Sequence, residues 1–127
     1  MAKQKANNII LPTSADVTKF KMLYPLINSD LDEIRELSKK KQDEPLNKFK
    51  VKTINKKLVQ IQEILKTEPT HEFLELLDED TFPSNSDAVL MISQFVKAMD
   101  QFKQRYYSND GSEFGLRDER NTWKTKD

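Results

Sequence analysis

The stretch Ser84–Tyr107, SNSDAVLMISQFVKAMDQFKQRYY, has the most regular apolar pattern in the chain. Its apolar residues recur at alternating steps of four and three, the spacing of one face of an α-helix. They are Ala88, Ile92, Phe95, Met99, Phe102 and Tyr106, and Val89, Leu90, Met91 and Val96 widen the face in the first half. Pro83 cannot continue a preceding helix, and Ser84 followed by Asp87 resembles a capping box. The stretch therefore predicts a long helix that other elements must cover.

A second helix is predicted from Ala15 to about Lys41, where apolar residues keep helical spacing. Pro25 lies inside this stretch, but the apolar pattern continues through it without a change of phase. We therefore expect one kinked helix. If the proline breaks it, Ser29 followed by Asp32 offers a second start.

A third helix is predicted from Pro45 to about Lys66, because proline suits a first helical turn and Pro69 follows the end closely. Its expected buried side consists of Leu46, Phe49, Ile54, Leu58, Ile61 and Leu65. The short connection after Lys41 implies that the first two helices in the chain are antiparallel neighbours. Thr70 can cap a short helix that continues through Asp78.

These helices predict an all-α fold, an antiparallel helical bundle of three long helices plus one short helix. The bundle is expected over residues 13–107, after a mobile N-terminal segment of residues 1–12. Residues 108–127 are rich in charges and are expected to form a disordered or loosely docked tail. We find no clear strand signal.

Composition excludes several classes of function for this chain of 127 residues. Lys plus Arg and Asp plus Glu both total 21, so net charge does not favour nucleic acid or an anionic membrane. No stretch is apolar enough for a membrane span or a signal peptide, and cysteine is absent, so we expect a cytoplasmic protein. The only glycines are Gly111 and Gly115, which excludes phosphate-binding loops and dinucleotide fingerprints, and we expect no cofactor.

Charge is divided unevenly along the middle of the chain. Lys39–Lys57 contains eight lysines and two acids, whereas Glu63–Asp80 contains seven acids and one lysine. Lys48, Lys52 and Lys56 are spaced four apart and share one helix face, which would suit contact with nucleic-acid phosphates. The stretch has no arginine and almost no interleaved aromatic residue, so only non-specific binding is expected. The alternative is a solvated face, or pairing with the acidic stretch within one chain or across a dimer.

The sole histidine, His71, raises the question of a metal site. Glu68 and His71 have the Glu-x-x-His spacing of di-metal bundles, with Glu72 and Glu75 nearby. Pro69 between them indicates that they straddle a helix start, and a second histidine would have to come from a dimer. A metal-dependent enzyme is therefore the third hypothesis. One histidine also gives little support for a serine or cysteine hydrolase.

Our leading hypothesis is a non-enzymatic interaction or regulatory module that acts on another protein chain through helix faces. Met99, Phe102 and Tyr106 continue the apolar pattern of Ser84–Tyr107 where few covering residues are expected, which predicts a homodimer through that end. In the tail, Trp123, with Phe114 and Leu116, could dock on a partner. Trp123 could equally pack back on the bundle or stay in solvent. Nucleic-acid binding through Lys39–Lys57 is the alternative, and no small-molecule substrate is evident.

Overall fold

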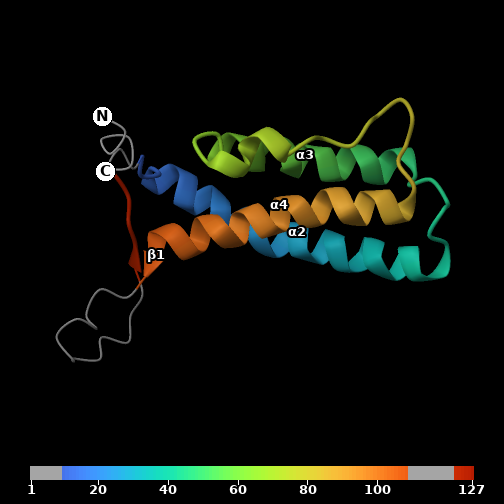
Figure 1. The fold of residues 1–127 in the computed structure, drawn as a ribbon, viewed down its shortest axis with the longest axis horizontal. Helices are drawn as coiled ribbons and strands as arrows, with labels where there is room; N and C mark the ends of the chain where they lie inside the picture. The colour runs from blue at the N-terminus through green and yellow to red at the C-terminus, as the bar shows by residue number, and fades with distance from the viewer. Residues whose placement is uncertain (1–9, 109–121) are drawn as a thin grey trace.

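The structure is a computed structural model, and it describes residues 10–108 and 122–127. Three long helices lie side by side, and α2 runs in the direction opposite to the other two (Figure 1). These helices are α2 (Ser14–Lys40), α3 (Lys48–Ile64) and α4 (Asn85–Tyr106). The predicted all-α antiparallel bundle is confirmed.

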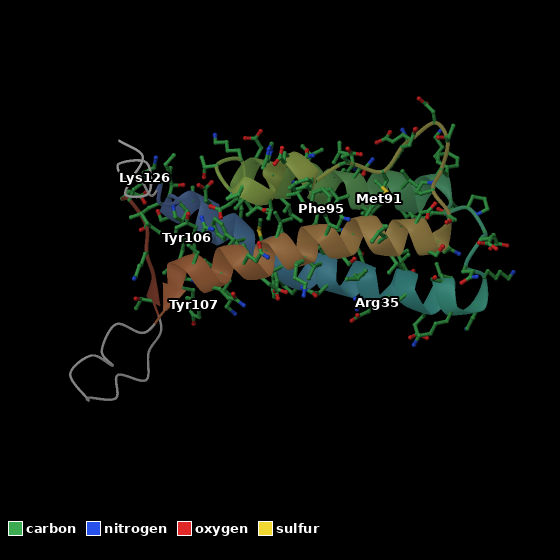
Figure 2. The ribbon with its side chains drawn as sticks, in the orientation of Figure 1. Arg35, Met91, Phe95, Tyr106, Tyr107 and Lys126 are labelled. Atoms are coloured by element: carbon green, nitrogen blue, oxygen red, sulfur yellow. The ribbon has the colours of Figure 1, made fainter. Side chains whose placement is uncertain are left out.

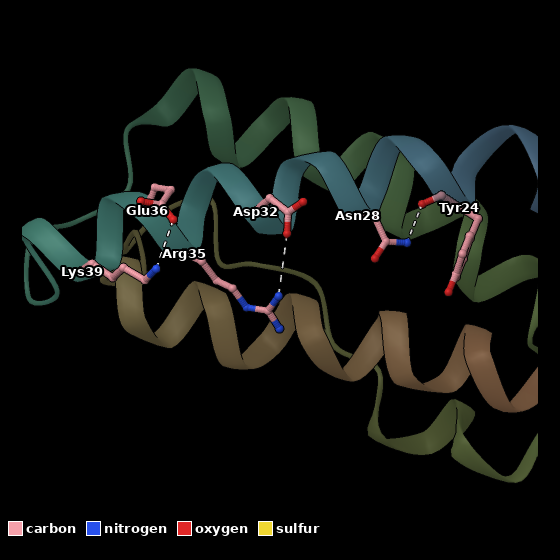
Figure 3. A network of polar contacts seen from close by, with 6 residues as sticks. All are labelled: Tyr24, Asn28, Asp32, Arg35, Glu36 and Lys39. Carbon is pink, nitrogen blue, oxygen red and sulfur yellow. Dashed lines mark hydrogen bonds and ion pairs between the residues drawn. The ribbon is translucent and has the colours of Figure 1, made fainter.

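Helix α2 is one continuous helix through Pro25, as the uninterrupted apolar phase predicts. It begins with a capping box: the Thr13 hydroxyl accepts a bond from the Asp16 N–H, and the Asp16 carboxylate accepts one from the Thr13 N–H, both at 3.1 Å. Polar side chains follow one another along part of the helix, with ion pairs from Arg35 to Asp32 and from Lys39 to Glu36 (Figure 3). These exposed pairs contribute little stability and mark the solvent-facing side.

Helix α3 begins at Lys48, three residues after the predicted start, and the Asn47 side chain caps it by accepting a 2.8 Å bond from the Lys50 N–H. Pro45 instead lies in the connection, where it forms an isolated β-bridge with Ser84. Hydrogen bonds to the start of α4 hold this connection in place, so it cannot join the helix. The prediction that Phe49 is buried is wrong, because its side chain is 77% exposed, and Val51 is buried on the inner side of the first turn.

The short helix predicted over Thr70–Asp78 is only partly present, as the 3-10 helix η1 (Pro69–Phe73). Residues 74–77 follow it without helical structure and lie along α3. The Asn55 side chain of α3 donates a 2.8 Å bond to the Leu77 carbonyl and accepts a 3.0 Å bond from the Leu77 N–H. Gln62 donates a 2.7 Å bond to the Leu74 carbonyl. We call residues 74–77 the covering segment, because Leu74 and Leu77 close the core while the residues between them stay exposed.

The apolar face of α4 is buried along its whole length. Ile92, Phe95 and Met99 are fully buried, and Phe102 and Tyr106 are 2% exposed. Figure 2 shows Met91 and Phe95 on the side of α4 that faces α3. The expectation that few residues cover Met99, Phe102 and Tyr106 is therefore wrong, since the chain itself covers them. The homodimer stays a prediction.

Part of this cover comes from the C-terminal residues. After α4, β1 (Tyr107–Ser108) pairs in antiparallel register with β2 (Thr122–Trp123), a two-residue pairing that the sequence does not predict. The Trp123 ring packs against Tyr107 at 5.0 Å, Phe20 at 5.1 Å and Phe102 at 6.0 Å between centroids. Trp123 therefore packs back on the bundle, which is one of the three alternatives that the sequence left open.

The last residues continue from Trp123 toward the start of α2. The Lys126 N–H donates a 2.9 Å bond to the Pro12 carbonyl, and the Asp127 carboxylate accepts bonds of 2.8 and 2.9 Å from the Ser14 N–H and hydroxyl. We call residues 122–127 the C-terminal latch. Most of the predicted mobile start, and the tail residues Phe114 and Leu116, lie outside the described residues.

Candidate functional site

The three lysines singled out by their spacing, Lys48, Lys52 and Lys56, all lie on the exposed side of α3. Five of the eight lysines between positions 39 and 57 form ion pairs within the chain. These pairs are Lys39–Glu36, Lys41–Glu44, Lys50–Glu33, Lys52–Glu79 and Lys57–Asp30. Only Glu79 among these acids belongs to the acidic stretch, so the basic stretch is balanced mainly by acids of α2 and of the connection after it.

Glu68 does not join His71 in a ligand set. Its side chain is 4% exposed and points into the bundle, where the Tyr106 hydroxyl donates a 2.9 Å bond to it and the Arg105 guanidinium lies 3.5 Å away. Burial and the bond to Glu68 raise the pKa of Tyr106 above its usual value. Among the described residues, no three histidine or acidic side chains are grouped closely enough to hold a metal ion. Glu68 therefore has a structural role here.

A groove of about 500 Å³ lies between α4 and the chain around Phe73. Leu74, Met91 and Ala98 supply its apolar lining. The polar lining comes from two parts of the chain, which carry opposite charges. The chain around Phe73 supplies Thr70, Glu72 and Glu75, and α4 supplies Gln94, Lys97 and Gln101. The combination of an apolar lining with a charged border is typical of a site that binds a peptide or helix.

Phe73 makes this groove unusual for a monomer surface. Its side chain lines the groove and is 64% exposed, although a phenylalanine ring buries a large apolar area when it is covered. Leu90 is 59% exposed and lies on the same side of α4 as Gln94, Lys97 and Gln101, which follow it at helical spacing. The apolar surface therefore extends along α4 beyond the hollow itself.

The groove exists because of where the covering segment lies. Asn55 and Gln62 bind the backbone of the covering segment to α3. The segment therefore does not cover the residues of α4 that line the groove. Met91 is left half-buried and Gln94 exposed as a result. The sequence contains one signal for this surface, the widening of the apolar face of α4 by Leu90 and Met91, which exceeds what the core needs. No sequence pattern predicts that Phe73 is exposed, because its exposure depends on where η1 ends in the folded chain.

Comparison of the chain with protein-family models, with curated proteins and with solved structures finds no match. Within residues 10–108 and 122–127, no helix combines the length and the apolar content that crossing a membrane requires.

Proposed function

We propose that this protein is a non-enzymatic interaction module that binds a helical segment of a partner protein in the groove between α4 and Phe73. The observation that supports this proposal most is the exposed Phe73 ring beside an apolar lining with charged borders. Exposed aromatic and methionine side chains are characteristic of surfaces that bind other proteins. The cytoplasmic location expected from the sequence is part of the same proposal.

The dimensions and charges of the groove define the partner segment. From Leu90 to Gln101 the groove side of α4 extends about 16 Å, the length of roughly three helical turns. A partner helix would place apolar side chains at positions i, i+3 or i+4, and i+7 against Leu74 and Met91. Basic side chains on one of its flanks would face Glu72 and Glu75.

Nucleic-acid binding through Lys48, Lys52 and Lys56 is the competing function. Its support is weaker because α3 contains no arginine for base recognition, and Phe49 is its only aromatic residue for stacking. Self-association stays a prediction, with no surface assigned to it once Met99, Phe102 and Tyr106 are buried.

A library of phage-displayed helical peptides, each 16 residues long, tests the proposed groove. Peptides would be selected on the wild-type protein and counter-selected on the Phe73→Ser, Met91→Glu double variant. We expect enriched peptides to share the apolar i, i+3/i+4, i+7 pattern with basic residues on one flank. By fluorescence anisotropy, each single substitution should weaken their binding about tenfold or more, as for central interface residues.

Leu26→Ser is the matched control, because Leu26 on α2 is 50% exposed and does not line the groove. Its affinity for the selected peptides should equal that of the wild type. Circular dichroism and thermal unfolding would verify that all variants fold. Failure to enrich any peptide, or enriched peptides that bind both single variants as tightly as the wild type, would refute the groove as the binding site.

A further inference from the structure

A second surface lies on the outer side of α3. Phe49, Lys52, Lys56 and Val59 follow one another at steps of three, four and three, so they share one helix face, and all four are exposed. Leu76 of the covering segment is exposed beside them, and a hollow of about 250 Å³ lies between the two elements. It is lined by Lys52, Asn55, Lys56, Val59, Leu76 and Glu79. We call this surface the α3 outer face.

The α3 outer face carries positive charge that its own chain balances only weakly. Within residues 10–108 and 122–127, Lys48 and Lys56 have no acidic partner. Lys52 lies 3.9 Å from Glu79, but both side chains are about half exposed, and such pairs contribute little. An acidic ligand can therefore interact with all three lysines, and among the described acids Glu79 is the one that pairs with a lysine of this set.

We propose that the α3 outer face binds an acidic amphipathic segment of a partner protein. Apolar side chains of that segment would cover Phe49, Val59 and Leu76, and its carboxylates would pair with Lys48, Lys52 and Lys56. Charge complementarity determines the chemistry of the partner, and the interleaved apolar side chains give it a surface to cover.

A nucleic acid fits this surface less well than an acidic peptide does. Phosphate contacts would use the three lysines but would leave Val59 and Leu76 uncovered, since these side chains offer nothing to a phosphate. Stacking of bases requires aromatic rings along the strand, whereas this face has only Phe49. No arginine is present for base recognition.

This inference is independent of the groove on α4, because the two surfaces share no lining residue. The acidic border of the groove selects a basic helix, while the α3 outer face selects an acidic segment. A protein with both sites could hold two different partner segments at once.

The experiment uses fluorescein-labelled 16-residue peptides that combine glutamates with leucines at i, i+3 or i+4, and i+7, measured by fluorescence anisotropy at 50 and 200 mM salt. We expect binding that weakens as salt rises. Lys52→Glu with Lys56→Glu, and separately Phe49→Ser, should each reduce affinity tenfold or more. Glu79→Gln should increase affinity several-fold, because it keeps an acceptor for Asn55 while it frees Lys52.

Lys19→Glu with Lys21→Glu on α2 is the matched control, since it makes the same charge change at two exposed positions outside this face, and it should bind like the wild type. Phe73→Ser should also leave acidic-peptide binding unchanged. Absence of peptide binding, or equal affinity in Phe49→Ser, would overturn the proposal. Tighter binding of single-stranded RNA or duplex DNA of equal charge, lost in the double lysine variant, would overturn it in favour of nucleic acid.

Discussion

The side chains of Glu68 and Tyr106 show how one buried polar pair joins distant parts of this chain. The Tyr106 hydroxyl lies 2.9 Å from the Glu68 carboxylate and 3.2 Å from the Ile10 carbonyl, so one hydroxyl meets acceptors from two other segments. A buried carboxylate is costly unless hydrogen bonds and charge partners compensate it. Tyr106 and Arg105 supply that compensation, both from the last turn of α4.

Stability should fall at alkaline pH through the two hydrogen-bonded tyrosines. The pKa of Tyr106 is raised by burial and by Glu68, and that of Tyr24 by its hydrogen bond to Asp100. Because the raised pKa favours the neutral phenol in the folded state, this stabilisation is complete below pH 10 and is lost as pH rises through the folded values. Thermal unfolding from pH 7 to 11 measures this loss of stability, and absorbance at 295 nm follows the ionisation of the tyrosines.

The Tyr106→Phe variant separates the contribution of Tyr106 to stability from that of Tyr24. At pH 7 it should lose about 1–3 kcal/mol, because one Glu68 oxygen loses its donor while still buried. The further loss of stability above pH 10 should be smaller than in the wild type. Tyr107→Phe, a half-buried control, should change stability by about 0.5 kcal/mol or less. An alkaline decline that is unchanged in the Tyr24→Phe, Tyr106→Phe double variant contradicts this account.

At the scale of elements, the covering segment depends on α3 more than on its own sequence. Leu74 and Leu77 supply apolar cover, but a single helical turn of the same residues would also bury some of them. Asn55 favours the observed non-helical conformation, because both its donor and its acceptor bond to the backbone of Leu77. The groove on α4 and the α3 outer face both take their shape from this segment.

Asn55→Ala should therefore destabilise the protein and loosen the covering segment. Two hydrogen bonds at about 1 kcal/mol each predict a loss near 2 kcal/mol in urea unfolding. Exchange of the Leu77 amide hydrogen should accelerate selectively. Asn28→Ala removes a single side-chain bond to the Tyr24 carbonyl within α2 and should cost less. Unchanged protection of the Leu77 amide in Asn55→Ala would refute the role given to Asn55.

For the whole molecule, the C-terminal latch joins the end of the chain to both α2 and α4. Trp123 covers Phe20 and Phe102, and Asp127 binds Ser14 in the first turn of α2, where the helix dipole also favours a carboxylate. The hydrogen bonds from Ser14 lower the pKa of Asp127. Docking of the latch is therefore strongest when Asp127 is ionised.

The only tryptophan of the chain makes this docking measurable. A lowered folded pKa means that the contribution of Asp127 is present above its usual pKa near 4 and is lost as pH falls through the folded value. The Trp123 emission maximum should therefore shift to longer wavelength in acid, before the helices unfold by circular dichroism. Asp127→Asn should show part of this shift already at pH 7. A Trp123 emission that is independent of pH until global unfolding contradicts the latch.

The three long helices could be predicted from local patterns alone, because apolar spacing, caps such as Ser84 and the positions of the prolines act within a few residues of one another. The apolar pattern also predicted which face of α4 is buried, but it did not predict the groove that Met91 lines. Local patterns did not predict that Phe49 and Phe73 are exposed, nor that Met99, Phe102 and Tyr106 are covered. Those outcomes depend on contacts between residues far apart in the chain, such as Asn55 with Leu77 and Trp123 with Phe20, which no local pattern encodes.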